Sequence, residues 1–111
     1  MEITTQQLKR VTVLSVNGRV DHDSAPQLES ALRQVMDSGE FNIVVDMDAA
    51  QYISSAGLRV LLAARKAARR FNRGDVRLAN LHDPVRKTFE LVGFTQIFTV
   101  YDDLVQAVGS F

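Results

Sequence analysis

The chain contains no cysteine among its 111 residues. This absence excludes disulfide frameworks, thiolate zinc sites, iron–sulfur clusters and cysteine nucleophiles. The chain also lacks any run of roughly 20 apolar residues, the length that a membrane-spanning helix requires. Residues 1–10 are polar, whereas a secretory signal peptide would contain an apolar stretch. We therefore expect a cytoplasmic protein without a membrane span, stabilised by the packing of its core.

The chain also lacks net charge, because 13 basic residues balance 13 acidic ones. A neutral chain has no overall electrostatic attraction to nucleic acid or to anionic lipid. One predicted helix nevertheless carries six basic residues and no acid: Arg59, Arg65, Lys66, Arg69, Arg70 and Arg73. A nucleic-acid surface is one interpretation, but the spread of these residues around the helix favours a solvated face. We expect no direct nucleic-acid partner.

Strand and helix patterns alternate from the start of the chain. Two strands are predicted at about 3–9 and 11–16, and the pair Asn17-Gly18 then breaks the pattern. Ser24 is predicted to be the N-cap of the first helix, and Gln27 completes a capping box with it. The chain thus opens with two strands and a capped helix.

The same alternation continues through the rest of the chain. A short run rich in β-branched residues at 41–45 predicts a strand buried on both faces, which Asp46 ends. A loop is predicted over 47–53, followed by the longest helix of the chain over 56–73. The remaining predictions are strands over 76–81 and 97–100, and helices that open at Asp83-Pro84 and at Asp102 or Asp103.

The complete order of predicted elements is β-β-α-β-α-β-α-β-α. This order predicts a single α/β domain over residues 1–111, with a mixed β-sheet and about four helices. A fold of this kind does not by itself assign a function, which must come from a site.

Two serines, Ser54 and Ser55, lie at the predicted start of the longest helix, just beyond a buried strand. A serine in this position usually caps the helix by accepting a hydrogen bond from a free backbone N–H. Gly57 follows in the first turn, where glycine costs about 1 kcal/mol relative to alanine. Close approach by another backbone would explain that glycine. The segment predicts either a simple cap or a functional site.

The segment from Asp46 to Leu62 resembles the signature of STAS domains, above all of the free-standing anti-sigma factor antagonists. In that signature a serine is followed by a small residue and by Gly57-Leu58. The phosphorylated serine of the family then falls on Ser55, with Ser54 as the second choice. Many kinase-regulated members carry aspartate where this chain has Ser54. The stretch from Gly18 to Ala25 is similar to the segment that leads into the family's first helix.

This resemblance implies a STAS fold and a non-enzymatic role in partner switching. The unphosphorylated domain would bind an anti-sigma factor that is also a serine kinase, which releases a sigma factor for transcription. Phosphorylation of Ser55 would inactivate the domain, and a serine phosphatase would reverse the modification. Asp21, Gly57 and Arg59 are the expected neighbours of this switch site. Asp21 either helps to bind the nucleotide-linked metal or orients the serine hydroxyl during phosphoryl transfer, or it is an exposed turn carboxylate. No cofactor and no resident metal are expected.

Two other functions are compatible with the sequence. The first is a non-phosphorylated STAS adaptor in a stress-signalling or lipid-transport complex. The second, more remote, is a serine hydrolase that combines Ser55 with His22 and a nearby aspartate. Residue 53 is isoleucine, so only half of the Gly-x-Ser-x-Gly motif is present. His22 and His82 match no metal-ligand spacing and are expected at the surface, and no nucleotide-binding Gly-x-x-x-x-Gly-Lys-Ser/Thr loop occurs.

Overall fold

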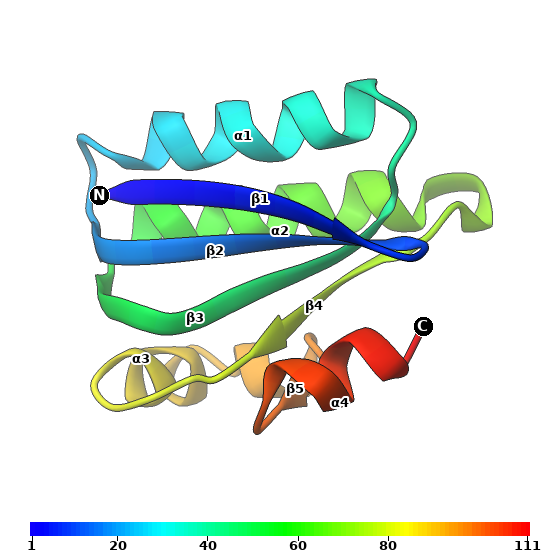
Figure 1. The fold of residues 1–111 in the computed structure, drawn as a ribbon. Coiled ribbons are helices and arrows are strands. Elements are labelled where there is room, and N and C mark those ends of the chain that lie inside the picture. The colour runs from blue at the N-terminus through cyan, green and yellow to red at the C-terminus, as the bar shows by residue number, and fades with distance from the viewer.

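The computed structural model describes all 111 residues and contains one five-stranded sheet and four α-helices (Figure 1). The strands are β1 Glu2–Leu8, β2 Val11–Val20, β3 Asn42–Ile53, β4 Asp75–Ala79 and β5 Val100–Tyr101. The helices are α1 Ala25–Asp37, α2 Ser55–Arg69, α3 Val85–Leu91 and α4 Leu104–Gly109, with short 3-10 helices η1 Arg70–Asn72 and η2 Phe94–Gln96. The predicted order of strands and α-helices is confirmed.

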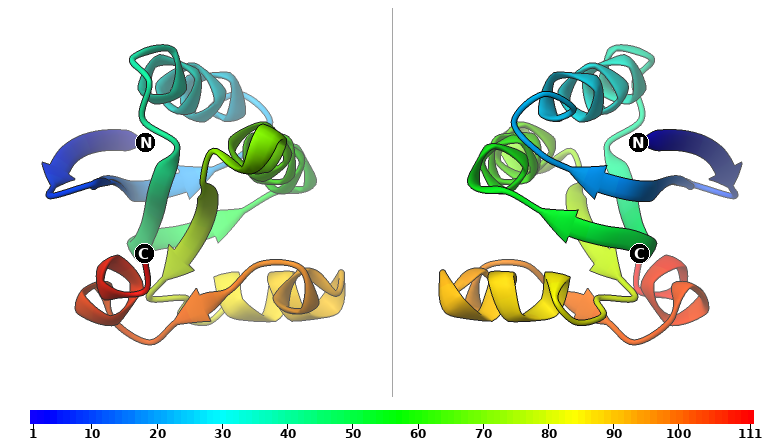
Figure 2. Two further views of the ribbon diagram at one scale, coloured as in Figure 1. Left: turned by 90° about the vertical axis from the view of Figure 1, so that its right-hand side faces the viewer. Right: turned by 90° about the vertical axis from the view of Figure 1, so that its left-hand side faces the viewer.

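The strands lie side by side in the order β1-β2-β3-β4-β5. β1 runs antiparallel to β2, and every other neighbouring pair is parallel, so the predicted mixed sheet is confirmed. Helices α1 and α2 cover one face, and α4 lies against part of the other face (Figure 2). Val44 and Val45 point to opposite faces and both are fully buried, which confirms the prediction of a strand covered on both sides. No helix has the length and apolar character needed to cross a membrane.

Strand β3 is much longer than the sequence predicts. Asp46 does not end it, and residues 47–53 are strand, not loop. Met47 and Ile53 are buried in the larger core, and this second half of β3 pairs with residues 17–20 of β2. The Asp46 carboxylate accepts hydrogen bonds from the Asn80 side chain at 3.0 Å and from the Asp48 backbone at 3.1 Å. A polar residue satisfied in this way does not interrupt a strand.

Strand β2 likewise passes through the Asn17-Gly18 pair, where the sequence pattern predicts a break. Its register with β3 shifts between Ser15 and Asn17 and again between Gly18 and Arg19. Gly18 has a φ of 101°, a backbone conformation open mainly to glycine. Register shifts of this kind bend a strand without ending it. Strands β2 and β3 therefore stay paired as far as the end of the sheet at which the two serines lie.

The predicted capping box at the start of α1 is not formed. Ser24 is the N-cap residue, but its side chain makes no cap hydrogen bond. Its hydroxyl instead accepts a hydrogen bond from the Asp21 backbone N–H at 2.9 Å and lies 3.0 Å from the carbonyl of Arg19. Gln27 contributes only its backbone N–H, which donates to the Ser24 carbonyl. The hydroxyl of Ser24 is used to build the preceding turn.

Some element boundaries also differ from the predicted ones. The long helix begins one residue earlier, at Ser55, and ends at Arg69; Phe71 and Asn72 then adopt positive φ values of 57°. The last strand is confined to residues 100–101, where the sequence predicts 97–100. Of the two aspartates considered as the cap of α4, Asp103 is the one whose side chain accepts a backbone hydrogen bond.

Candidate functional site

The candidate site lies where the parallel strands β2 and β3 end. The backbone N–H of Ser54 donates to the carbonyl of Val20 at 2.8 Å, which ties the start of α2 to the turn that leads into α1. Both turns lie at the same end of the sheet in Figure 1. Carboxyl ends of neighbouring parallel strands meet at one edge, which is where α/β proteins commonly bind their ligands. The two segments that resemble the family signature are thus brought together.

The two serines have different roles at the start of α2. Ser54 is the N-cap, and its hydroxyl accepts a hydrogen bond from the Gly57 backbone N–H at 3.3 Å. Ser55 is the first residue of the helix and is exposed, whereas Ser54 is only half-exposed. Ser54 therefore caps the helix, and the hydroxyl of the neighbouring Ser55 is not used for capping. Ser54 supplies the cap that the common family aspartate would also supply, because both residues are strong N-caps.

Gly57 is buried and is required for packing. A Cβ atom at this position would lie 2.7 Å from the Val20 side chain and 2.8 Å from the Ile53 side chain. The expectation that another backbone approaches this glycine is wrong, because side chains of β2 and β3 approach it instead. The glycine lets the first turn of α2 sit directly on the ends of these two strands.

Asp21 organises the turn between β2 and α1. Its Oδ1 atom accepts hydrogen bonds from the backbone N–H groups of Asp23 at 3.0 Å and Ser24 at 2.9 Å, and lies 3.1 Å from the Ser24 hydroxyl. The bond from the Ser24 backbone is the main reason why the pKa of Asp21 lies below its ordinary value of 3.8. All the hydrogen bonds of this carboxylate lie within its own turn, and none reaches Ser55.

Replacement of Asp21 by asparagine is expected to change how stability depends on pH. Because the pKa of Asp21 is lower in the folded state, its ionised form stabilises the fold above pH 3.8 and the contribution is lost as pH falls through the folded-state pKa. The wild type should therefore lose stability relative to Asp21→Asn as the solution is acidified from neutral pH. Urea denaturation at a series of pH values measures the difference. Asp23→Asn is the matched control, and a pH-independent difference for Asp21→Asn would contradict the expectation.

Arg59 lies one helical turn after Ser55 on α2 and is exposed. Residues four apart on a helix share a face, so the guanidinium can reach a group attached to Ser55. Other members of the basic set are used within the fold. Arg65 and Arg69 form ion pairs with Asp75. Arg73 donates to two carbonyls at the end of α2, so a uniformly solvated basic face is not what the structure contains.

Arg19 and Tyr52 also lie at this end of the sheet, although their sequence positions do not mark them as site residues. They are register neighbours on β2 and β3, and the Arg19 guanidinium lies 4.3 Å from the centre of the Tyr52 ring. A cation over an aromatic face at this distance is an attractive contact. The pairing depends on the register of two strands separated by more than 20 residues in the chain, so no local sequence signal predicts it.

Neither histidine forms a hydrogen bond with Ser55. Both are exposed, as expected. His82 lies 2.7 Å from the Asp48 carboxylate, and this hydrogen-bonded pair does not include a serine. No group of three or more histidine or acidic side chains gathers in a geometry that could hold a metal ion. The side-chain arrangement needed for the hydrolase hypothesis, a serine hydrogen-bonded to a histidine, is not formed.

Comparison with known proteins decides the family. A family model of the STAS domain matches residues 2–107. The chain belongs to the STAS domain family. A Bordetella bronchiseptica protein named as an anti-sigma factor antagonist, BtrV, is 36% identical over 111 residues, covering 100% of this chain and 95% of the relative. The anti-sigma-F factor antagonist RsfB of Mycobacterium tuberculosis is 27% identical over 107 residues, covering 96% of this chain and 85% of the relative.

Solved STAS structures have the same fold as this chain. An anti-sigma factor antagonist from Mycobacterium paratuberculosis superposes with a TM-score of 0.88 at 25% identity, covering 98% of this chain and 92% of the other. The phosphorylated form of SpoIIAA, a Bacillus cell fate determinant, superposes with a TM-score of 0.75 at 16% identity, covering 98% of each chain. At that lower identity the likeness shows the fold alone. The predicted resemblance to STAS domains is confirmed.

Proposed function

We propose that this STAS protein is an anti-sigma factor antagonist, a binding protein that captures an anti-sigma factor and so releases a sigma factor. Relatives that align along nearly the whole chain carry this name, with 36% identity in the case of BtrV. The structural observation that carries the proposal is the exposed hydroxyl of Ser55 at the first residue of α2. Since Ser54 provides the cap, this hydroxyl is not needed to hold the helix together.

Phosphorylation of Ser55 is the proposed switch. The positive end of the helix dipole and the free N–H groups of the first turn favour an anion at this position. Arg59, one turn further along, adds a positive charge on the same face. A phosphate adds about −1.5 to −2 charges at neutral pH, and this charge would have to be desolvated or repelled in a protein interface. The fold would therefore survive the modification while partner binding is lost.

The proposed partners are an anti-sigma factor that is itself a serine kinase and a serine phosphatase that removes the phosphate. The kinase would meet an uncharged residue, Ser54, where many family members present an aspartate. Ser54 retains the capping hydrogen bond but removes a negative charge beside the acceptor hydroxyl. A kinase adapted to this protein would need no positive group opposite residue 54. Asp21, held in the turn that follows β2 by its hydrogen bonds with Ser24, would contact the kinase and not Ser55.

The test is the intact mass of the protein isolated from its native cells under several growth conditions, with any phosphate mapped to a residue. We expect one phosphate per chain, on Ser55, in an amount that varies with growth condition. Ser55→Ala should abolish the modification. Ser54→Ala is the matched control and should remain phosphorylated, although it loses a cap contributing about 1 kcal/mol. Phosphate on Ser54, or no phosphate in any condition, would contradict the switch, and the second result would favour a constitutive adaptor.

A further inference from the structure

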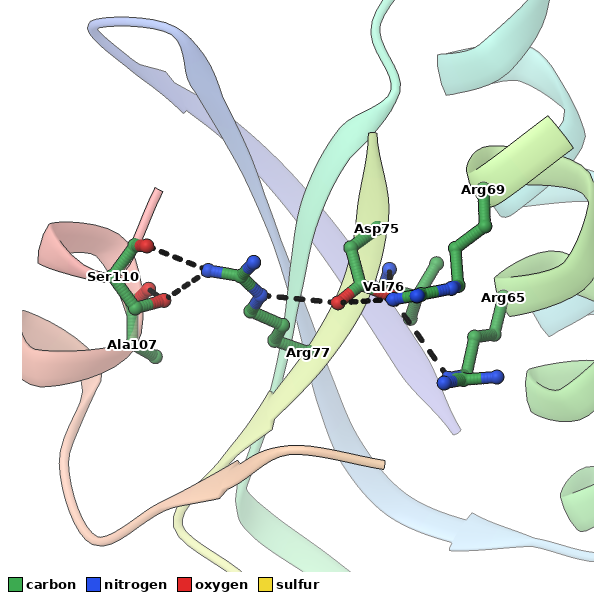
Figure 3. A network of polar contacts seen from close by, with 7 residues as sticks. All are labelled: Arg65, Arg69, Asp75, Val76, Arg77, Ala107 and Ser110. Atoms are coloured by element: carbon green, nitrogen blue, oxygen red, sulfur yellow. Dashed lines mark hydrogen bonds and ion pairs between the residues drawn. The ribbon is translucent and has the colours of Figure 1, made fainter. Parts of the chain in front are cut away.

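A second polar site lies at the opposite end of the sheet, where β3 and β4 begin. Asp75 is the first residue of β4, and only 6% of its surface is exposed. Figure 3 shows three arginines arranged around it, two from α2 and one from β4. The carboxylate lies 3.3 Å from Arg69, 3.1 Å from Arg77 and 4.0 Å from Arg65. Three guanidinium groups against one carboxylate leave two positive charges in excess in a partly buried place.

A cavity of about 240 Å³ adjoins this cluster. Its polar lining includes Arg69, Arg77, Asn42 and Asn72 as well as Asp75, and its one hydrophobic lining residue is Phe111. Asp75 and the guanidinium of Arg77 are largely buried, so less solvent screens their charges than in bulk water, whereas Arg69 and Asn72 border the solvent. Arg65 does not line the cavity, so Arg69 and Arg77 face the opening with one positive charge in excess of Asp75, and the opening has a size suited to a small anion.

Several hydrogen-bond donors around the cavity are unused. The guanidinium of Arg69 forms an ion pair with Asp75 through Nη1 and donates no hydrogen bond within the chain. Arg77 uses two of its nitrogens, Nε on Asp75 and Nη1 on the carbonyl and hydroxyl of Ser110, so that Nη2 remains free (Figure 3). The Asn72 side chain has no partner within the chain, and that of Asn42 makes one long bond of 3.4 Å. Guanidinium and amide N–H groups are donors that match oxyanion oxygens.

We propose that this cavity binds a small tetrahedral oxyanion, phosphate or sulfate, between Arg69 and Arg77 with the amides of Asn42 and Asn72. Arg77 is held rigidly by Asp75 and Ser110, so little side-chain entropy is lost when it binds. Arg69 is half-exposed and completes the site from the end of α2. The site is separate from Ser55, because Ser55 and Arg69 are the first and last residues of α2 and lie about 21 Å apart along the helix axis.

The experiment is an NMR titration of the intact protein with inorganic phosphate and, separately, with sulfate at constant ionic strength. Saturable shifts of the side-chain amides of Asn42 and Asn72 are expected with both anions. Arg69→Gln should weaken binding about tenfold or more, the loss expected for one charge-assisted contact. Arg70→Gln is the matched control, since it removes the same charge one residue away and Arg70 does not line the cavity. It should leave the affinity within about twofold of wild type.

A second variant keeps the proposal testable if Arg69→Gln does not fold. Asn72 has a φ of 57°, and aspartate tolerates this conformation about as well as asparagine. Asn72→Asp places a carboxylate at the cavity and should abolish the shift of the Asn42 side-chain amide by repulsion of the anion. Shifts that do not saturate in the wild type would overturn the proposal. Equal weakening by Arg69→Gln and Arg70→Gln would also overturn it, because a diffuse charge effect would then explain the titration.

Discussion

Ser55→Asp is expected to weaken binding to the anti-sigma factor by about a hundredfold or more, which corresponds to a loss of roughly 3 kcal/mol. The side chain at residue 55 is exposed at the start of α2, where a partner surface can cover it. A carboxylate covered in this way must lose its hydration without a matched positive group on the partner. Calorimetric titration of the purified anti-sigma factor with each variant measures the effect.

Ser55→Ala is the matched control for this experiment. It removes the hydroxyl without adding charge, and substitution of an exposed side chain usually changes stability by less than about 0.5 kcal/mol. We expect it to bind the anti-sigma factor as the unmodified protein does and to remain bound in the presence of ATP. Equal affinity of Ser55→Asp and Ser55→Ala would show that charge at residue 55 does not control binding, and would favour the adaptor role.

Asp75→Ala should cause the largest loss of stability among the charged residues, about 3 kcal/mol. The change leaves Arg65 and Arg77 partly buried without their counter-charge, and it removes the acceptor for the backbone N–H of Val76. Urea denaturation of the purified protein measures the difference in unfolding free energy. The predicted loss exceeds that of an ordinary surface ion pair because the carboxylate is nine-tenths buried.

Two further variants separate the causes of that loss. Asp102→Ala is the matched control, since its carboxylate is 92% exposed and lies 3.8 Å from Arg86; its removal should cost less than about 1 kcal/mol. Asp75→Asn keeps an acceptor for the Val76 backbone and should be intermediate. If Asp75→Ala cost no more than Asp102→Ala, the three arginines would be stable without this carboxylate, and the description of a charge-dependent cluster would be wrong.

The order of the elements could be predicted because each pattern is local. Helical spacing of apolar residues and the alternation or clustering of β-branched residues depend on neighbours within a few positions, so all five strands and four helices were expected in the right sequence. Their ends could not be predicted equally well. Aspartate is typical of the end of a strand, but the side chain of Asn80 on the neighbouring segment donates a hydrogen bond to the Asp46 carboxylate, and the strand continues. Glycine is typical of a turn, but Gly18 lies inside β2, at a point where the register with β3 shifts.

The candidate site was found in part from local sequence. The serine pair, Gly57 and the preceding strand are adjacent in the chain, and their pattern led to the family that the comparison confirms. The division of roles between Ser54 and Ser55 was not predictable, because either serine can cap a helix that begins one residue earlier or later. The close approach to Gly57 also depends on Val20, which is distant in sequence.

The sequence by itself determined the family, the order of elements and the position of the serine pair, since all of these follow from short patterns read along the chain. Only the tertiary structure decided which hydroxyl is free, how far β2 and β3 extend, and that Asp75 gathers arginines from α2 and β4. The physical reason is that these features depend on hydrogen bonds and ion pairs between distant segments, such as the contact from Arg77 to Ser110. Buried polar groups need such contacts, and the packing of strands and helices determines which groups come close enough to form them.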